Sequence, residues 1–220
     1  MSVILCIETA TTNCSVALGK EGKLLALKED YSKNYSHAER LHLFIDEILQ
    51  ENRLKASDLS AIAVSKGPGS YTGLRIGVSA AKGLCFSLDI PLISVPTLTS
   101  LAWQVPQEES DFIIPLLDAR RMEVYTAGFT GAKNDIFDTR AEILDENSFS
   151  EYLEKGTVTF IGNGVEKFSK LCSHEHARFK TEELPSAKEM VTLAEEKFQK
   201  GLFEDVAYFE PYYLKDFQAG

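Results

Sequence analysis

The chain has 220 residues, a hydrophobic content of 44%, and 33 acidic against 23 basic side chains, which gives a net charge of −10. This composition is typical of a globular protein. No apolar run is long enough for a membrane span, and an acidic chain without a basic stripe is poorly suited to bind nucleic acid by itself. The N-terminus lacks the basic region of a signal peptide, so we expect a first strand there and a cytoplasmic protein.

Five strands are predicted in the first hundred residues. Residues 3–7 are continuously apolar, residues 14–18 can form a hairpin partner, and a third strand starts near Leu24. Further apolar runs follow at 61–65 and 91–95. Three strands, then a helix and another strand, begin a mixed α/β layer structure.

Two helices are predicted between these strands. Ser36 and Glu39 form a capping box, and the apolar spacing after them predicts an amphipathic helix over 36–52. A second helix is predicted over 72–88, with many small side chains. Glycine inside a helix costs about 1 kcal/mol relative to alanine, so these positions indicate the close approach of another backbone, from within the chain or from a partner. The small residues are Gly73, Gly77, Ala80, Ala81 and Gly83.

The second half of the chain begins with a polar stretch at 106–111, the best candidate for a domain boundary. A hairpin is predicted over 112–129, and its charged turn is typical of a solvated tip. A strand over 157–162 runs into a helix, and a second capping box at Ser186 begins a helix over 187–200.

The candidate boundary at 106–111 would divide the chain into two lobes. The N-terminal lobe comprises residues 1–105 and is completed by the aromatic C-terminal tail, which should dock on the body of the protein. The smaller second lobe comprises residues 106–205.

The segment GPGSYTGLR, from Gly67 to Arg75, is a glycine-rich turn between an apolar strand and a helix N-terminus. Free N–H groups and the positive end of the helix dipole converge at such a point, and Arg75 adds a positive charge, so the segment is suited to an anion. It lacks the lysine of a Walker A loop, and Thr72 stands where a dinucleotide fingerprint needs glycine. Two interpretations stay open, a well-packed tight turn and an anion or nucleotide contact. The residues of the second interpretation are Glu8, Gly67, Gly69, Ser70 and Thr72.

Titratable side chains give little support for catalysis or for a metal. His37 and His42 are five residues apart and point to different faces, and Leu41 stands where a helical metal pair needs its second histidine. Glu8 ends the first strand without a glycine in the turn after it, so we expect structural polar pairing, with a cation contact as the alternative. The four cysteines are widely spaced and are expected to be buried, reduced thiols. We therefore predict no metal site, no catalytic side chain and no cofactor in this chain.

Several segments, in the same order along the chain, resemble one protein family. They are ILCIETATTNCSVAL, HAERL, GPGSYTGLRIGVSAAKGL, VPTLTSLA, DARRMEVY and IGNG. Together they are similar to the bacterial TsaB family, also called YeaZ, densely over residues 1–125 and more thinly afterwards. The resemblance implies an α/β, actin-like ATPase (ribonuclease H-like) fold with two lobes, each with a mixed sheet and flanking helices.

The resemblance also implies a role in tRNA modification. Members of the family belong to the machinery that forms N6-threonylcarbamoyladenosine (t6A) at position 37 of tRNAs reading ANN codons. A catalytic paralogue, TsaD, transfers the threonylcarbamoyl group, TsaB-like proteins pair with it, and a small ATPase, TsaE, joins them. The implied role is a non-catalytic subunit that activates TsaD and reaches tRNA through the complex, with ATP at the assembled complex.

The implied partner interface is a helix bundle formed with the helices 36–52 and 72–88, and the same surface can form a homodimer when the chain is alone. The paralogue carries a metal-binding HxxxH on the first helix, whereas this chain has His37 and Leu41 at the two positions. This difference argues against transferase or peptidase activity in this subunit alone. The interface residues that the resemblance implies are His37, Arg40, Leu41, Phe44, Ile48, Gly73, Arg75, Ile76, Gly77 and Ala80.

Two other functions stay open. An independent ATP-binding phosphotransferase of the actin-like fold is disfavoured because the loop after the first strand has no glycine and no lysine is suitably placed. A metallopeptidase of the M22 class, an older label for the superfamily, is disfavoured by Leu41. Nucleotide binding by the isolated chain and metal analysis would distinguish these two functions from a partner subunit.

Overall fold

The computed structural model describes residues 1–31 and 37–215 of the chain. The chain divides into two compact units. Unit 1 comprises Met1–Ser100 together with Pro185–Gly220, and unit 2 comprises Leu101–Leu184. No helix within the described ranges combines the length and the apolar character that crossing a membrane requires.

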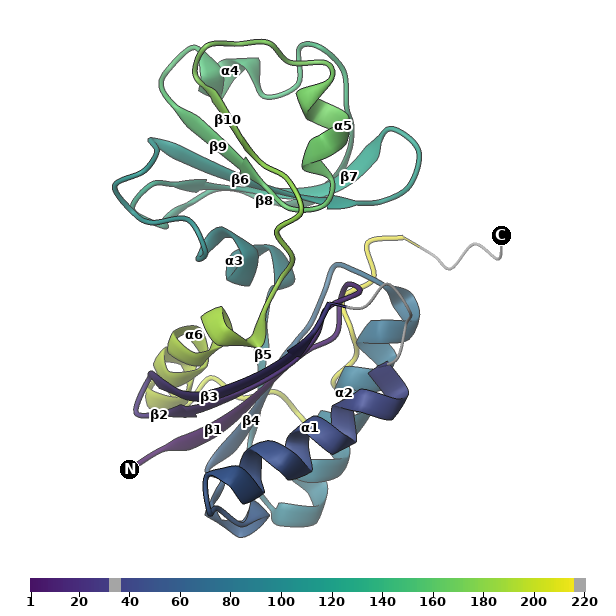
Figure 1. Ribbon diagram of the computed structural model, residues 1–220, viewed down its shortest axis with the longest axis vertical. Coiled ribbons are helices and arrows are strands. Elements are labelled where there is room, and N and C mark those ends of the chain that lie inside the picture. Colours follow the sequence, from purple (N-terminus) through teal and green to yellow (C-terminus); the bar gives the residue numbers. More distant parts are fainter. Residues whose placement is uncertain (32–36, 216–220) are drawn as a thin grey trace. The chain divides into compact units, whose positions relative to one another are not determined.

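Unit 1 is built on a five-stranded mixed sheet (Figure 1). Its strands are β1 (Val3–Glu8), β2 (Cys14–Lys20), β3 (Lys23–Asp30), β4 (Ala61–Ser65) and β5 (Leu92–Val95). They lie in the order β3-β2-β1-β4-β5, with β1 antiparallel to β2 and parallel to β4. β1, β4 and β5 are buried along their whole length, because helices cover both faces of the sheet. The five predicted strands are confirmed.

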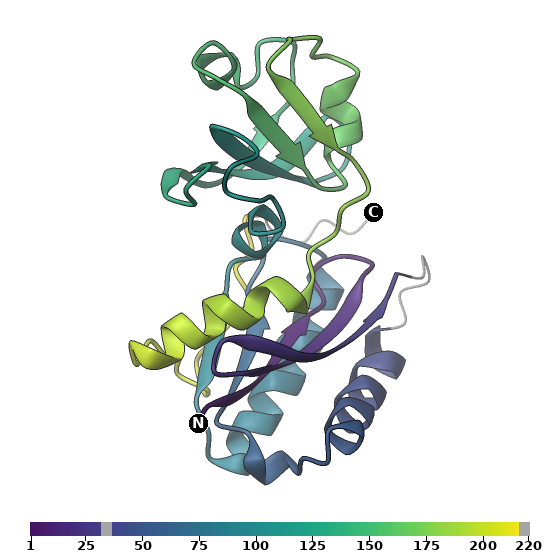
Figure 2. The same cartoon turned by 60° about the vertical axis from the view of Figure 1, so that its left-hand side comes forward.

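Figure 2 shows the helices on the two faces of this sheet. α1 (His37–Glu51) and α2 (Tyr71–Leu88) pack on one face, and α6 (Ala187–Gln199) packs on the other, against β1, β2 and β5. The apolar stripe of α1 enters the core beside β2, as its spacing predicts. A short 3-10 turn (Ala56–Asp58) leads from α1 toward β4.

The helix N-termini agree with the sequence where the structure describes them. The Ser70 hydroxyl accepts a hydrogen bond from the Gly73 N–H at the start of α2 (3.3 Å), and Ser186 accepts one from the Lys188 N–H at the start of α6 (3.0 Å). Ser36, predicted to cap α1, lies outside the described residues.

Unit 2 contains a second five-stranded mixed sheet, in the order β10-β9-β6-β7-β8. Its strands are β6 (Phe112–Asp118), β7 (Glu123–Thr130), β8 (Asp135–Ile143), β9 (Val158–Ile161) and β10 (Ala177–Lys180), and its short helices are α4 (Ser150–Leu153) and α5 (Val165–Ser169). Aromatic rings dominate its core, where the ring centres of Phe149, Phe160 and Phe168 lie 4.8–5.5 Å apart. A further helix, α3 (Thr97–Ala102), contains the division between the two units.

Two predictions about the second lobe need correction. The sequence predicts that this lobe extends from residue 106 to residue 205, but α6 buries Met190, Val191 and Ala194 against the sheet of unit 1. The predicted boundary at 106–111 also lies inside unit 2. β8 was not predicted, because it is an edge strand with mostly exposed or half-buried side chains and therefore shows no apolar run.

Candidate functional site

The glycine-rich turn between β4 and α2 is held from within the chain. The N–H groups of Gly67 and Ser70 donate to Thr97 Oγ1 (3.1 Å) and to the Ala10 carbonyl oxygen (2.7 Å). The Gly73 N–H donates to the Ser70 hydroxyl. Three donors that would have been suited to an anion are therefore already satisfied.

The small residues at the start of α2 bring this helix against the turn that follows β1. A Cβ atom at Gly69 would lie 2.5 Å from the Ala10 carbonyl oxygen, and one at Gly73 would overlap the carbonyl oxygen of Thr9. A Cβ atom at Gly77 would overlap Thr9 Oγ1, which donates a hydrogen bond to the Gly73 carbonyl (2.8 Å). The close approach indicated by Gly73 and Gly77 is therefore internal, and it needs residues without a side chain.

Glu8 ends β1 as a fully buried acid. Its Oε1 accepts hydrogen bonds from the Ala10 N–H (2.6 Å) and from the Ser65 hydroxyl (2.7 Å), whereas Oε2 has no partner among the described residues. Burial raises the pKa of the carboxyl group to about 7, and the hydrogen bonds only partly oppose this rise. The structural polar pairing expected for Glu8 is confirmed.

This arrangement does not fit a nucleotide phosphate. Phosphate loops present free N–H groups and leave room for the backbone to approach the ligand. Here three of the donors are bonded, and Thr9 and Ala10 fill the space beside the turn. Glu8 and Gly67 are buried, Gly69 and Ser70 are half-buried, and Thr72 alone of the five predicted contact residues is exposed. The structure supports the packed-turn interpretation of this segment.

His37 is a core side chain. It is 2% exposed, its Nε2 lies 2.7 Å from the Thr11 carbonyl oxygen, and burial lowers the pKa of its imidazole. Leu41, one turn later, is fully buried. Within the parts of the chain that the structure describes, no three His, Cys, Asp or Glu side chains are grouped as metal ligands would be.

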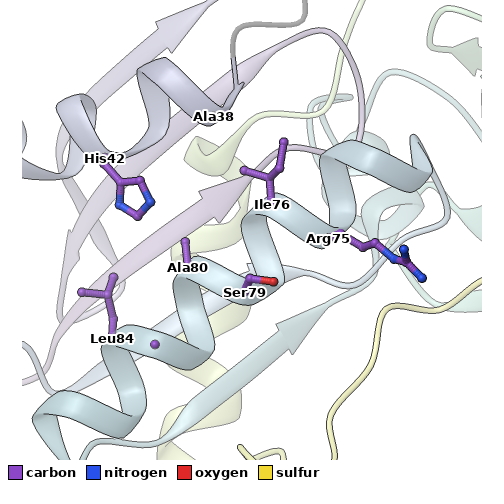
Figure 3. A pocket seen from close by; sticks show the side chains of 8 residues that line it. Ala38, His42, Arg75, Ile76, Ser79, Ala80 and Leu84 are labelled. Atoms are coloured by element: carbon purple, nitrogen blue, oxygen red, sulfur yellow. The ribbon is translucent and has the colours of Figure 1, made fainter.

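An open groove of about 570 Å³ lies between α1 and α2 (Figure 3). Ile76, Ala80 and Leu84 follow one another at four-residue intervals on the side of α2 that faces α1, and His42 lines the groove from α1. Gly83 also lines it and has no heavy atom within 4 Å of the position that a Cβ atom would take. The lining of the groove is therefore largely apolar and includes several small residues.

The interface residues implied by the family resemblance fall into a buried and an exposed group. The buried residues are His37, Leu41, Phe44, Ile48, Gly73 and Gly77. They pack α1 and α2 on the sheet, so these side chains serve the core of unit 1, and their place in a partner interface stays a prediction. Arg40, Arg75, Ile76 and Ala80 are at least partly exposed, and all of these except Arg40 line the groove.

Five lining residues were missed by the sequence prediction: Ala38, His42, Ser79, Gly83 and Leu84. Their spacing is a signal that could have grouped them, because residues four apart share a helix face: Ala38 with His42, Ser79 with Gly83, and Leu84 with the predicted Ala80.

Arg75 is held at the groove by two tyrosines that are far apart in the sequence. Its guanidinium lies 4.0 Å from the centre of the Tyr71 ring, and its Nε donates to the Tyr213 hydroxyl (3.2 Å). Just before Tyr213, the Tyr212 N–H donates to the Lys66 carbonyl (2.7 Å), so the C-terminal segment crosses the glycine-rich turn. Docking of the aromatic tail was predicted, but nothing in the sequence pointed to Arg75 as the residue that the tail contacts.

All four cysteines are buried and form no disulfide, as expected: Cys6, Cys14, Cys85 and Cys172. Burial raises the pKa of the Cys14 and Cys85 thiols to about 11. These two side chains therefore remain protonated at neutral pH and act as small apolar core residues.

Comparisons with known sequences agree on one kind of protein. The family model described as "TsaD: tRNA N6-adenosine threonylcarbamoyltransferase" matches residues 32–220. The "tRNA threonylcarbamoyladenosine biosynthesis protein TsaB" of Escherichia coli K12 is 31% identical over 223 aligned positions, which cover 97% of this chain and 94% of that protein. The protein of the same name from Bacillus subtilis is 40% identical over 135 positions, which cover 61% of this chain and 58% of that protein.

Solved structures agree with this result. YeaZ from Pseudomonas aeruginosa has a TM-score of 0.86 and 27% identity, and the match covers 97% of this chain and all of that chain. A second structure, described as an uncharacterized protein with similarity to peptidase YEAZ from the same organism, has a TM-score of 0.83 and 26% identity. The predicted two-lobed α/β fold of the actin-like class is confirmed.

Proposed function

The chain belongs to the TsaB (YeaZ) family of tRNA threonylcarbamoyladenosine biosynthesis proteins, and from this membership we propose that it is a non-catalytic subunit of the complex that forms t6A at position 37 of tRNAs reading ANN codons. In this role it dimerises with the catalytic paralogue TsaD and activates it, TsaE joins the pair, and tRNA is reached through the assembled complex in the cytoplasm. Any ATP acts at the assembled complex and not in this chain.

The observation that carries the proposal is the apolar groove between α1 and α2. Helices pack closely where the facing residues are small and apolar, because their ridges can then enter the grooves of the neighbour. Ile76, Ala80 and Gly83 provide such a surface, and Arg75 adds a charge that can pair with a carboxylate of the partner. A helix of TsaD is the occupant that we propose, and a second copy of this chain takes its place when TsaD is absent.

The inward-facing polar residues support a subunit without its own active site. His37 is bonded to the chain's own backbone, Leu41 fills the position of a second helical histidine, and Glu8 is enclosed behind the packed turn. These contacts weigh against the metallopeptidase and against the independent phosphotransferase.

The test is threonylcarbamoyl transfer to an unmodified tRNA, reconstituted from TsaD, TsaE and threonylcarbamoyl-AMP, with and without this chain. We expect transfer only when this chain and TsaD are both present, and none with this chain alone. A rate that does not change when the chain is omitted would contradict the proposal. Micromolar ATP binding by the isolated chain would instead favour the phosphotransferase.

A further inference from the structure

The connection between β6 and β7 in unit 2 presents two neighbouring arginines in an unusual backbone conformation. Arg120 has a φ of +69° and Arg121 a φ of +51°, and both residues are exposed. The left-handed region is sterically unfavourable for residues with a Cβ atom, and glycine or asparagine is usual there. Local turn formation alone therefore gives no reason for arginine at either position.

The base of this connection is fixed by hydrogen bonds. The Asp118 carboxylate accepts the Arg120 N–H (2.6 Å) and pairs with Lys167 Nζ (2.6 Å). Lys167 also donates to the Glu123 carbonyl (3.1 Å), and Asn163 Oδ1 accepts the Asp118 N–H (2.9 Å). Because Lys167 balances the charge of Asp118, this aspartate is not left to attract the two guanidinium groups.

Both guanidinium groups lack a partner within the described part of the chain. Among the described residues, neither the Arg120 nor the Arg121 side chain forms an ion pair or a hydrogen bond, although the whole chain carries ten more acidic than basic groups. Arg40 and Arg140, in contrast, pair with Asp30 and Glu142. Two adjacent guanidinium groups that no carboxylate of residues 1–31 or 37–215 pairs with are suited to a polyanion.

Apolar side chains lie beside the arginines. Met122 is 42% exposed and follows them directly, and Ile143, at the end of β8, is 73% exposed. The β7–β8 register pairs Ile143 with Glu123, and the Leu144 N–H donates to the Met122 carbonyl (2.8 Å), so the two apolar side chains belong to the same end of the sheet. We call the surface formed by Arg120, Arg121, Met122 and Ile143 the hairpin tip.

We infer that the hairpin tip binds the phosphate backbone of RNA, with the two guanidinium groups on phosphates and the apolar pair against the ribose or base between them. The inference rests on the proposed function, which brings tRNA to the complex. RNA is favoured over an acidic protein partner because the tip offers adjacent planar forks, which suit closely spaced phosphates. Because hydrogen bonds already fix the base of this connection, little conformational entropy is lost on binding.

The test compares variants in the assembled complex with TsaD. Arg120→Asn with Arg121→Gly removes both charges and supplies residues that favour a left-handed turn, so the tip should keep its backbone. Arg53→Asn is the control, because it makes the same change from arginine to asparagine at another left-handed position. Arg53 is also exposed and has a φ of +55°, and its side chain has no hydrogen-bond or ion-pair partner among the described residues, but it lies in unit 1. The probe is an unmodified tRNA transcript, and its affinity is measured over a range of salt concentrations.

We expect the double variant to bind the transcript about 10- to 30-fold more weakly at 0.15 M salt, and the slope of log K against log salt to fall by about 1.4–1.8, because two phosphate contacts are lost. Arg53→Asn should leave both values unchanged. Unchanged RNA affinity and slope in the double variant would overturn the inference. So would weaker assembly with TsaD or TsaE at unchanged RNA affinity, because the tip would then be a protein contact. Transfer that does not depend on this chain at all would contradict the proposed function, while the salt slope would still test the tip.

Discussion

The two faces of α2 carry similar small residues for opposite reasons. On one face, Gly73 and Gly77 touch Thr9 so closely that a methyl group would overlap it. On the other, Gly83 borders an open groove with no atom near the position of a Cβ. The first face fixes unit 1, whereas the second leaves a surface for another helix. A glycine in a helix thus indicates close approach, but its neighbours decide whether the fold or a partner makes that approach.

The sharpest way to test this difference is to add the same methyl group on both faces. Gly73→Ala places a Cβ against the Thr9 carbonyl oxygen, which is backbone and cannot rotate away. We expect it to lower the free energy of unfolding by about 3 kcal/mol or more, as in other overpacked cores. Denaturant unfolding followed by circular dichroism measures the change.

Gly83→Ala is the matched control. Its new methyl group meets nothing within 4 Å, so alanine's better helix propensity should raise stability by up to about 1 kcal/mol. Equal effects of the two substitutions would contradict the distinction between the faces.

The buried carboxyl group of Glu8, at the end of β1, should also make the stability of the protein depend on pH. The pKa of Glu8 is about 7 in the folded chain, above its unfolded value, so the folded state holds a proton that the unfolded state has already lost. Stability from this group is fully present below the unfolded pKa and is lost as pH rises through about 7. The loss approaches about 3 kcal/mol, at 1.36 kcal/mol for each pKa unit.

Glu8→Gln keeps the acceptor for Ala10 and Ser65 but cannot ionise, so its stability should fall less between pH 5 and pH 8 than that of the wild type. Unfolding free energies measured at several pH values test this expectation. Parallel curves of unfolding free energy against pH for the two proteins would show that burial does not raise the pKa of Glu8. This result would contradict the enclosed position of its carboxyl group.

A smaller effect, on the affinity for TsaD, is expected where Arg75 lines the groove between α1 and α2. Tyr213→Phe removes the hydroxyl that accepts from Arg75 Nε but keeps the aromatic ring. Arg75 should then sample more orientations, and TsaD should bind a few-fold more weakly, as expected when one hydrogen bond is lost. Tyr208→Phe is the control, because Tyr208 is an 84% exposed tyrosine on the same segment. Calorimetric titration with TsaD gives both affinities. Equal affinities would show that the Tyr213 hydroxyl does not orient Arg75 for binding.

Much of the fold could be predicted because its signals are local. Continuous apolar runs marked β1 and β4, and the capping residue at Ser186 marked the start of α6. The lobe to which α6 belongs could not be predicted in the same way. A helix amphipathic over residues 187–200 fits either sheet, and only long-range packing of Met190 and Val191 places it in unit 1.

The candidate site was predicted less completely, for a related reason. The two helices that border the groove were predicted correctly. A stripe of small and apolar residues, however, does not show which side of a helix faces the core. Leu41 and Ile48 were therefore assigned to the interface although they are buried, and Gly83 was not assigned although it borders the groove. The contact between Arg75 and Tyr213 spans 138 residues, a separation at which local pattern gives no information.

The central claim, that this chain activates TsaD by receiving one of its helices between α1 and α2, is tested most directly by titrating the chain into the reconstituted transfer assay. Wild type, Gly83→Ala and Gly83→Trp are compared, because Gly83 lines the groove, a Cβ atom there meets no heavy atom within 4 Å, and an indole is large enough to obstruct a partner helix. We expect wild type and Gly83→Ala to saturate alike, and Gly83→Trp to need about 30-fold more protein, the effect of losing about 2 kcal/mol at an interface centre. A folded Gly83→Trp protein that saturates at the wild-type concentration would contradict the claim.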